Sequence, residues 1–254
     1  MVLFGDSIVL CYIIFFSLLG SVGSVLISGL LLIFPDEIQK GLIPKCISFA
    51  TGTLLGAAFL GLIPHAAEGF GDIRMTLLMV LVGIIIFFIL EKFVIWRHCH
   101  DDHCHVHEAS GSLIMIGDAF HNFVDGVVIA ATFTTSIPLG ITTAFSVITH
   151  EIPQEVGDFA ILLKNNYSKK RAFMLNILSG LSSLAGAILA FFFMSTLTNA
   201  TPYIMSISAA SFIYVAISDL IPHLQKHTNP KESIIQTLLI LAGISVIYFM
   251  SHTH

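Results

Sequence analysis

The sequence predicts an all-α polytopic membrane protein with eight transmembrane helices and a single domain, residues 1–254. Of its 254 residues 56% are hydrophobic and only 11% are charged, and the mean hydropathy is +0.91. A soluble domain carries roughly 25% charged residues, whereas a helix that crosses a bilayer needs about 20 apolar residues. Eight segments meet that requirement and leave little chain for a soluble domain. They are residues 7–34, 44–67, 74–96, 110–134, 138–163, 171–195, 202–224 and 231–251.

The first three segments are expected to be retained helices. No basic stretch precedes residues 7–34, and the apolar run is far longer than the roughly 7–15 residues of a signal peptide. Residues 44–67 contain Gly52-Thr53-Leu54-Leu55-Gly56, in which small side chains allow neighbouring helices to approach closely. Residues 74–96 are apolar almost throughout and end at a hydrophilic loop, residues 97–109.

The end of the seventh segment resembles the end of the second. Residues 171–195 again contain small side chains, from Ser179 to Ser183. Residues 202–224 end in Asp219-Leu220-Ile221-Pro222-His223, which resembles the Gly61-Leu62-Ile63-Pro64-His65 that ends residues 44–67. In an eight-span chain these two ends face opposite sides of the membrane, as corresponding parts of an inverted repeat do. The sequence therefore predicts pseudo-inverted repeats.

The distribution of basic residues predicts the orientation, because cytoplasmic loops are enriched in Lys and Arg. Ten of the eleven basic residues fall in or beside the loops after the first, third, fifth and seventh spans, and only Arg74 lies on the other side. Both termini are therefore expected to be extracytoplasmic. The ten are Lys40, Lys45, Lys92, Arg97, Lys164, Lys169, Lys170, Arg171, Lys226 and Lys231.

The fourth and fifth spans carry polar residues that an apolar environment penalises. Five of them are carboxylates, and no Lys or Arg occurs between residues 110 and 163. Each unpaired charge at mid-bilayer costs about 2.5–3.5 kcal/mol on insertion scales, so the group requires protonation or a bound cation. The carboxylates are Asp118, Asp125, Glu151, Glu155 and Asp158, accompanied by His121, Asn122, His150 and Gln154.

Helical periodicity gathers these residues on one face of each span. At about 100° per residue, the polar residues of each helix fall within a single stripe, and two facing stripes would form a polar seam through the bundle. Imidazole, carboxylate and amide oxygen suit Zn²⁺, Fe²⁺ or Mn²⁺ and are poor ligands for anions. The alternative is a polar network that only holds helices together.

Two motifs resemble those of the ZIP (Zrt/Irt-like protein) family of divalent metal transporters. They are His121-Asn122-Phe123-Val124-Asp125-Gly126 and His150-Glu151-Ile152-Pro153-Gln154-Glu155-Val156-Gly157-Asp158, closest to the subfamily with HNFxDG and HExPHExGD. The resemblance implies an eight-helix ZIP-type bundle, import of metal toward the cytoplasm and a homodimer. It also implies that His121 and Asp125 bind metal at the principal site and that Asn122 and Glu151 bind it at an adjacent second site.

The remaining motif positions hold His150, Gln154 and Glu155, of which Glu155 is expected to assist. The related subfamily usually has His where this chain has Gln154, and a neutral amide oxygen is a weaker ligand for Zn²⁺ than imidazole. The expected substrates are therefore Zn²⁺ or Fe²⁺, and Mn²⁺ or Cd²⁺ as further candidates. Some family members supply an acidic second-site ligand from the sixth helix, where this chain offers only Asn176, Ser179, Ser182 and Ser183.

Residues outside the central motifs are candidates for the path of the metal. The resemblance makes His65 an intake ligand and Asp219 and His223 exit ligands; the alternative is that they are ordinary polar residues at helix ends. Asp118 and Asp158 lie about one turn beyond the central group. They either line the path or serve capping and packing.

The loop at residues 97–109 is predicted to be cytoplasmic and to capture or sense metal, because His and Cys at this density suit soft metals. Its alternative is a merely solvated polar loop. In a reducing compartment its two thiols are expected to be metal ligands and not a disulfide. The candidate ligands are His98, Cys99, His100, His103, Cys104, His105 and His107.

Two other functions compete with transport. His150-Glu151-Ile152-Pro153-Gln154 begins like the H-E-x-x-H of zinc proteases, but the second His is missing and Pro interrupts the helix. An intramembrane metal-dependent hydrolase or a metal-sensing membrane protein therefore stays an alternative. No phosphate-binding loop for ATP is present. The net charge of −5 is spread thinly, and we expect no nucleic-acid partner and no catalytic cofactor.

Overall fold

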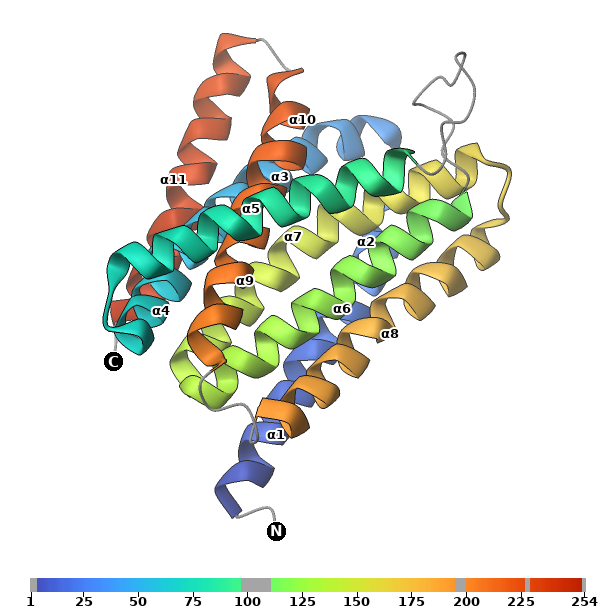
Figure 1. Ribbon diagram of the computed structural model, residues 1–254. Helices are drawn as coiled ribbons and strands as arrows, with labels where there is room; N and C mark the ends of the chain where they lie inside the picture. The colour runs from blue at the N-terminus through green and yellow to red at the C-terminus, as the bar shows by residue number, and fades with distance from the viewer. Residues whose placement is uncertain (1–3, 97–110, 195–199, 227–228, 253–254) are drawn as a thin grey trace.

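The computed structural model describes residues 4–96, 111–194, 200–226 and 229–252, and every element in these ranges is helical. The helices run side by side as one bundle (Figure 1). The elements are α1 Phe4–Leu18, η1 Leu19–Gly23, α2 Ser24–Leu31, α3 Asp36–Gly56, η2 Ala57–Leu62, α4 Ile63–Phe70, α5 Ile73–Trp96, α6 Gly111–Thr135, α7 Ile137–Lys164, α8 Lys169–Met194, α9 Thr201–Val215, η3 Ala216–Leu220, α10 Ile221–Gln225 and α11 Pro230–His252.

Within the described ranges, six helical stretches are long and apolar enough to cross a membrane. The six do not include α6 or α7, which carry the polar stripes that lower their apolar character. The chain is therefore an all-helical protein with multiple apolar spans, and the count of eight stays a prediction. The surface agrees with a lipid environment, because large apolar side chains such as Ile85, Phe88, Leu238 and Phe249 are exposed on α5 and α11.

One predicted boundary is wrong. The second span begins at Asp36 and not near residue 44, and it runs on to Phe70. Pro35 has an extended backbone, and Asp36 and Glu37 occupy the first helical turn, where acidic side chains interact favourably with the helix dipole. Hydropathy alone misses this polar first part of the helix.

The helices that carry the stripes pack closely against their neighbours. A Cβ at Gly126 on α6 would lie 1.8 Å from the Ser183 carbonyl oxygen of α8, and one at Gly186 would lie 2.2 Å from the Phe123 carbonyl oxygen. Only glycine permits backbones to come this close. On the other side of α7, the Thr53 and Thr149 hydroxyls are 2.7 Å apart, which joins α3 to α7.

The ends of the bundle differ in charge. The connection between α10 and α11, the end of α5 and the connection between α7 and α8 lie toward the upper edge of Figure 1, and both termini lie away from it. Lys92, Lys164, Lys169 and Lys226 belong to the first group of segments. This Lys-rich end is the one that the sequence predicts to be cytoplasmic.

The two Leu-Ile-Pro-His sequences share a local structure. Each follows a π-helical segment, η2 before His65 and η3 before His223, and each continues into a short α-helix, α4 or α10. A π-helical turn inserts one residue into an α-helix and is often found at functional sites. The shared distortion supports the predicted repeat.

Candidate metal centre

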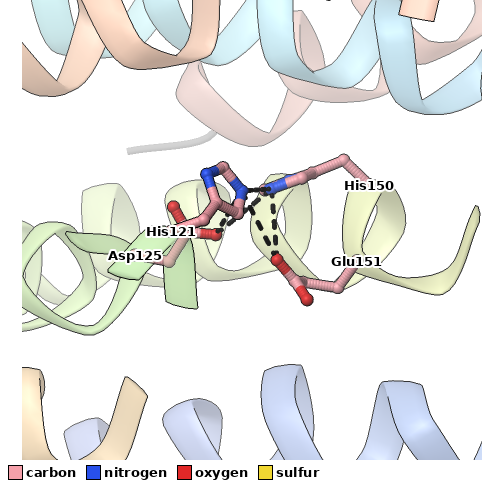
Figure 2. Close-up of side chains that lie close together, drawn as sticks. All are labelled: His121, Asp125, His150 and Glu151. Atoms are coloured by element: carbon pink, nitrogen blue, oxygen red, sulfur yellow. Dashed lines mark hydrogen bonds and ion pairs between the residues drawn. The ribbon is translucent and has the colours of Figure 1, made fainter. Parts of the chain in front are cut away.

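The centre is built where α6 and α7 lie side by side in the middle of the bundle (Figure 1). Its four nearest donor groups come as one pair from each helix. His121 and Asp125 are one turn apart on α6, and His150 and Glu151 are adjacent on α7. Figure 2 shows the four side chains pointing toward one another.

The donor atoms of these four residues lie at distances that suit one small cation. His121 Nε2 is 3.1 Å from His150 Nε2, 3.7 Å from Asp125 Oδ2 and 3.6 Å from Glu151 Oε1. His150 Nε2 is 3.1 Å from Asp125 Oδ2 and 3.5 Å from Glu151 Oε1. A tetrahedral Zn²⁺ with bonds of about 2.0–2.1 Å places its ligand atoms about 3.3–3.4 Å apart. The five distances between donor atoms, 3.1–3.7 Å, bracket that separation.

The surroundings hold the donors in place and bury three of the four. His150 Nδ1 lies 2.9 Å from the Ser146 carbonyl oxygen, a contact that directs Nε2 at the centre, as partners of ligand histidines commonly do. The side chains of Asp125, His150 and Glu151 are at most 1% exposed, and that of His121 is 17% exposed. Among the described residues, the ion-pair partners of Asp125 and Glu151 are these two imidazoles and no Lys or Arg.

A second group lies beside the first and shares Glu151 with it. One carboxylate oxygen from each of Asp118, Glu151 and Glu155 falls within 4.8 Å of the others, and all three residues are buried. Asn122 and Gln154 turn their amide nitrogens toward Asp118 Oδ1, at 3.0 and 3.2 Å. The structure thus places Asp118 in this second group, and it pairs Gln154 with Asp118.

Cavities extend from the centre toward the Lys-rich end. One of about 290 Å³ is lined by Asp118, His121, Gln154, Asp158 and Asp219. Another of about 430 Å³ shares Gln154, Asp158 and Asp219 with it and is also lined by His223 and Lys40. Asp158 and Asp219 therefore line both cavities, and His223 lines the larger one.

His65 lies at the opposite end of the bundle. It lines two other cavities, of about 610 and 250 Å³, neither of which is lined by any of the four donor residues. Phe212, 1% exposed, packs on His150 with ring centroids 6.0 Å apart. The cavities lined by His65 thus share no lining residue with the four-donor group. The ligands predicted at residues 97–109 lie outside the described residues.

Comparison with known proteins shows which family the sequence belongs to. A sequence model described as "ZIP Zinc transporter" matches residues 95–251. This chain belongs to the ZIP zinc transporter family.

Curated ZIP relatives match most of the chain. The zinc transporter ZIP13 of Pongo abelii is 31% identical over 259 residues, which cover 92% of this chain and 77% of that protein. Zinc transporter SLC39A7 of Mus musculus is 30% identical over 304 residues, covering 84% and 63%. Zinc transporter zipt-7.2 of Caenorhabditis elegans is 34% identical over 143 residues, covering 55% and 31%. The chain spans slightly less than two thirds of the SLC39A7 proteins it matches.

Within this ZIP domain, the structure adds two features that the sequence analysis missed. The Ser146 carbonyl orients His150, and the i−4 position of Ser146 on the same helix was a signal for it. Asp118, which the sequence analysis places about one turn beyond the central group, lies close to Glu151 and Glu155 in the second group. Two of the sixth-helix candidates contact α6, since Ser179 and Ser182 donate to the carbonyl oxygens of Met115 and Ala119.

Proposed function

We propose that this chain carries divalent transition metal ions across a membrane toward the cytoplasm, with Zn²⁺ as a substrate and Fe²⁺, Mn²⁺ and Cd²⁺ as possible competitors. The observation that carries the proposal is the four-donor group of His121, Asp125, His150 and Glu151. Its spacing suits a tetrahedral cation, and it is buried within a bundle of apolar helices. The relatives are named as zinc transporters, which favours transport over hydrolysis or sensing.

In the proposed topology, the chain crosses the membrane eight times. Although α6 and α7 are polar on one face, they lie between helices that are apolar enough to span, and α6 packs on α8 along most of its length. We infer that α6 and α7 cross with their neighbours and that their polar stripes face one another instead of lipid. The Lys-rich end then faces the cytoplasm, both termini face away from it, and the loop at residues 97–109 is cytoplasmic.

The cavities suggest which side the centre communicates with. His121 lines a cavity together with Asp158 and Asp219, whereas the cavities lined by His65 contain none of the four donor residues. We infer from this a state that is open toward the Lys-rich end, which the proposal assigns to the cytoplasm. In the opposite state, a path from His65 to the centre would open and admit metal. Metal would then leave past Asp219 and His223 once the bundle returns to the state described here.

Three parts of the proposal rest on the family resemblance. They are the homodimer, the role of the loop histidines and cysteines, and the use of Asn122 and Gln154 as ligands. Asn122 and Gln154 now contact Asp118 through their amide nitrogens, and each retains an amide oxygen that suits a hard or borderline cation.

Uptake of radioactive zinc and iron into vesicles that contain the purified chain tests the proposal. We expect the double variant His121→Ala, Asp125→Ala to lose uptake, and Glu37→Ala, a change at an exposed residue on α3, to retain it. Unchanged uptake in the double variant would overturn the proposal. Metal binding without uptake in the unmodified protein would favour a sensor, and metal-dependent peptide or lipid cleavage would favour the hydrolase.

A further inference from the structure

We propose that Thr53 on α3 is a positioning residue for the metal ligand His150 on α7. Its hydroxyl and its carbonyl oxygen hold Thr149 and Ser146, and these two residues form the contacts around the acceptor that orients the imidazole. The inference deepens the proposed function and rests on it, because it identifies a residue outside the ligand set that tunes the affinity of the same site.

The Ser146 carbonyl oxygen is the atom on which these contacts converge. It lies 2.9 Å from His150 Nδ1, and it also lies 2.9 Å from the Thr149 hydroxyl, which can donate to it. A carbonyl oxygen only accepts hydrogen bonds, so a neutral imidazole here carries its proton on Nδ1 and presents the Nε2 lone pair to the centre. The orientation of His150 therefore depends on where the backbone of α7 places this oxygen.

Thr53 holds this part of α7 through two contacts. Its hydroxyl lies 2.7 Å from the Thr149 hydroxyl, and its carbonyl oxygen accepts a hydrogen bond of 3.1 Å from the Ser146 hydroxyl. Thr53 and Ser146 are both 0% exposed, and a hydrogen bond is electrostatically stronger in the interior than in water. Thr53 thus joins α3 to the turn of α7 that precedes the ligand.

The Thr53 carbonyl lies where the helix changes its hydrogen-bond register. At Ala57, α3 passes into the π-helical η2, and the backbone N–H of Ala57 is shared between the carbonyl oxygens of Thr53 and Leu54. The Ser146 hydroxyl supplies the Thr53 carbonyl with a second donor. Because π-helical turns are often found at functional sites, this contact gives η2 a role in supporting the metal centre.

The packing of α3 on α11 gives Thr53 a fixed support. A Cβ at Gly52, next to Thr53, would lie 2.1 Å from the Ile240 carbonyl oxygen of α11, and one at Gly243 would lie 2.5 Å from the Phe49 carbonyl oxygen of α3. Only glycine permits such close contact between two backbones. The position of α3 is therefore set by α11, and Thr53 passes it on to α7.

Each hydroxyl has one proton, which limits how these groups pair. Thr53 can donate either to Thr149 or to the Ala50 carbonyl oxygen, 2.9 Å away. Thr149 can donate either to Thr53 or to the Ser146 carbonyl. Without the Thr53 hydroxyl, the Thr149 hydroxyl is left with the Ser146 carbonyl and competes there with His150. Loss of the Thr53 hydroxyl should therefore loosen the orientation of the imidazole and weaken metal binding.

Binding of Co²⁺, a spectroscopic substitute for Zn²⁺, to the purified full chain tests the inference. Thr53→Val removes the hydroxyl and keeps the branched shape. We expect it to weaken Co²⁺ binding by about threefold to tenfold, less than the roughly 10–100-fold typical for loss of a direct partner of a ligand. The visible absorption of the bound ion, which depends on its ligand geometry, should change as well. Thr53→Ser keeps the hydroxyl and is expected to restore both.

Thr51→Val is the matched control. Thr51 is buried on the same helix, and its hydroxyl donates to the Ile47 carbonyl oxygen of that helix, 2.8 Å away. This variant should change neither the affinity nor the spectrum. The double variant Thr53→Val, Thr149→Val is expected to bind no more weakly than Thr149→Val alone, because both hydroxyls belong to one chain of contacts.

Four results would overturn the inference. They are an unchanged affinity and spectrum in Thr53→Val, an equal change in Thr51→Val, failure of Thr53→Ser to restore binding, and additive losses in the double variant. If Thr53→Val does not fold, Thr149→Val compared with Thr149→Ser gives the same test. A chain whose Co²⁺ spectrum depends on Thr53 but which moves no metal into vesicles would refute the proposed function and leave the positioning role intact.

Discussion

Gln154 on α7 reaches across to α6 and donates a hydrogen bond from Nε2 to Asp118 Oδ1, 3.2 Å away. The position at which this chain departs from the motif of its related subfamily therefore contacts the carboxylate group. The same amide lines both cavities on the side of the Lys-rich end. Residue 154 thus contacts Asp118 beside the metal centre and also lines the cavities next to it.

Replacing Gln154 by His should shift metal preference toward Zn²⁺. The imidazole adds a nitrogen ligand next to His150, and a nitrogen ligand favours Zn²⁺ over Mn²⁺. We expect the ratio of Zn²⁺ to Mn²⁺ uptake to rise by about tenfold, a change of about 1.4 kcal/mol. Competition among Zn²⁺, Fe²⁺, Mn²⁺ and Cd²⁺ in reconstituted vesicles measures this ratio, and an unchanged ratio would remove residue 154 from metal selection.

Replacing Glu151 by Gln should weaken both metal groups at once. Glu151 belongs both to the four-donor group and to the group of Asp118, Glu151 and Glu155, and the substitution removes its charge while keeping its shape. Affinities for Cd²⁺ and Mn²⁺ are both expected to fall by tenfold or more, since hydrogen bonds and contacts to charged groups contribute about 1.5–3 kcal/mol. Equilibrium binding to purified protein measures both, and Glu37→Gln should change neither.

Replacing Gly126 by Ala should destabilise the bundle. The added methyl group would lie 1.8 Å from the Ser183 carbonyl oxygen, and a backbone atom moves away only if α6 and α8 separate. Overpacking of this kind costs about 1–3 kcal/mol or more. We expect a lower melting temperature in detergent, measured by the fluorescence of a thiol-independent dye.

Gly117 on the same helix is the matched control, because a Cβ there would meet nothing within 4 Å. Alanine also favours the helix by about 1 kcal/mol relative to glycine. Gly117→Ala should therefore leave the melting temperature unchanged or raise it. An equal loss of stability in both variants would show that contact with α8 is not the cause.

Single cysteines should report which side each cavity opens to. Ala160 lines the cavity with Asp219 and His223, and Thr135 lines one with His65. In a background without native cysteines, Ala160→Cys should react with a membrane-impermeant thiol reagent from the cytoplasmic side only, and Thr135→Cys from the other side only. Labelling of intact cells and inverted vesicles distinguishes the two, and the opposite pattern would reverse the proposed orientation.

Much of the architecture was accessible from sequence because apolar length and helical spacing are local properties. The spacing on α6 brought His121 and Asp125 to one face, and the family motif paired them with His150. The contact between Gln154 and Asp118 was not accessible, because it depends on the relative rotation of two packed helices. The π-helical segments before His65 and His223 were equally hidden, since no residue type specifies an inserted turn.

The two Leu-Ile-Pro-His sequences differ at the residue before them, Asp219 in one and Gly61 in the other. The repeat is therefore asymmetric in charge at this position, which holds a carboxylate in one copy and no side chain in the other. If the carrier is passive, net flux still vanishes when the electrochemical potential of the metal is equal on both sides, whatever the charge at each mouth. The asymmetry should instead appear as unequal half-saturating metal concentrations on the two faces, lower on the face of Asp219.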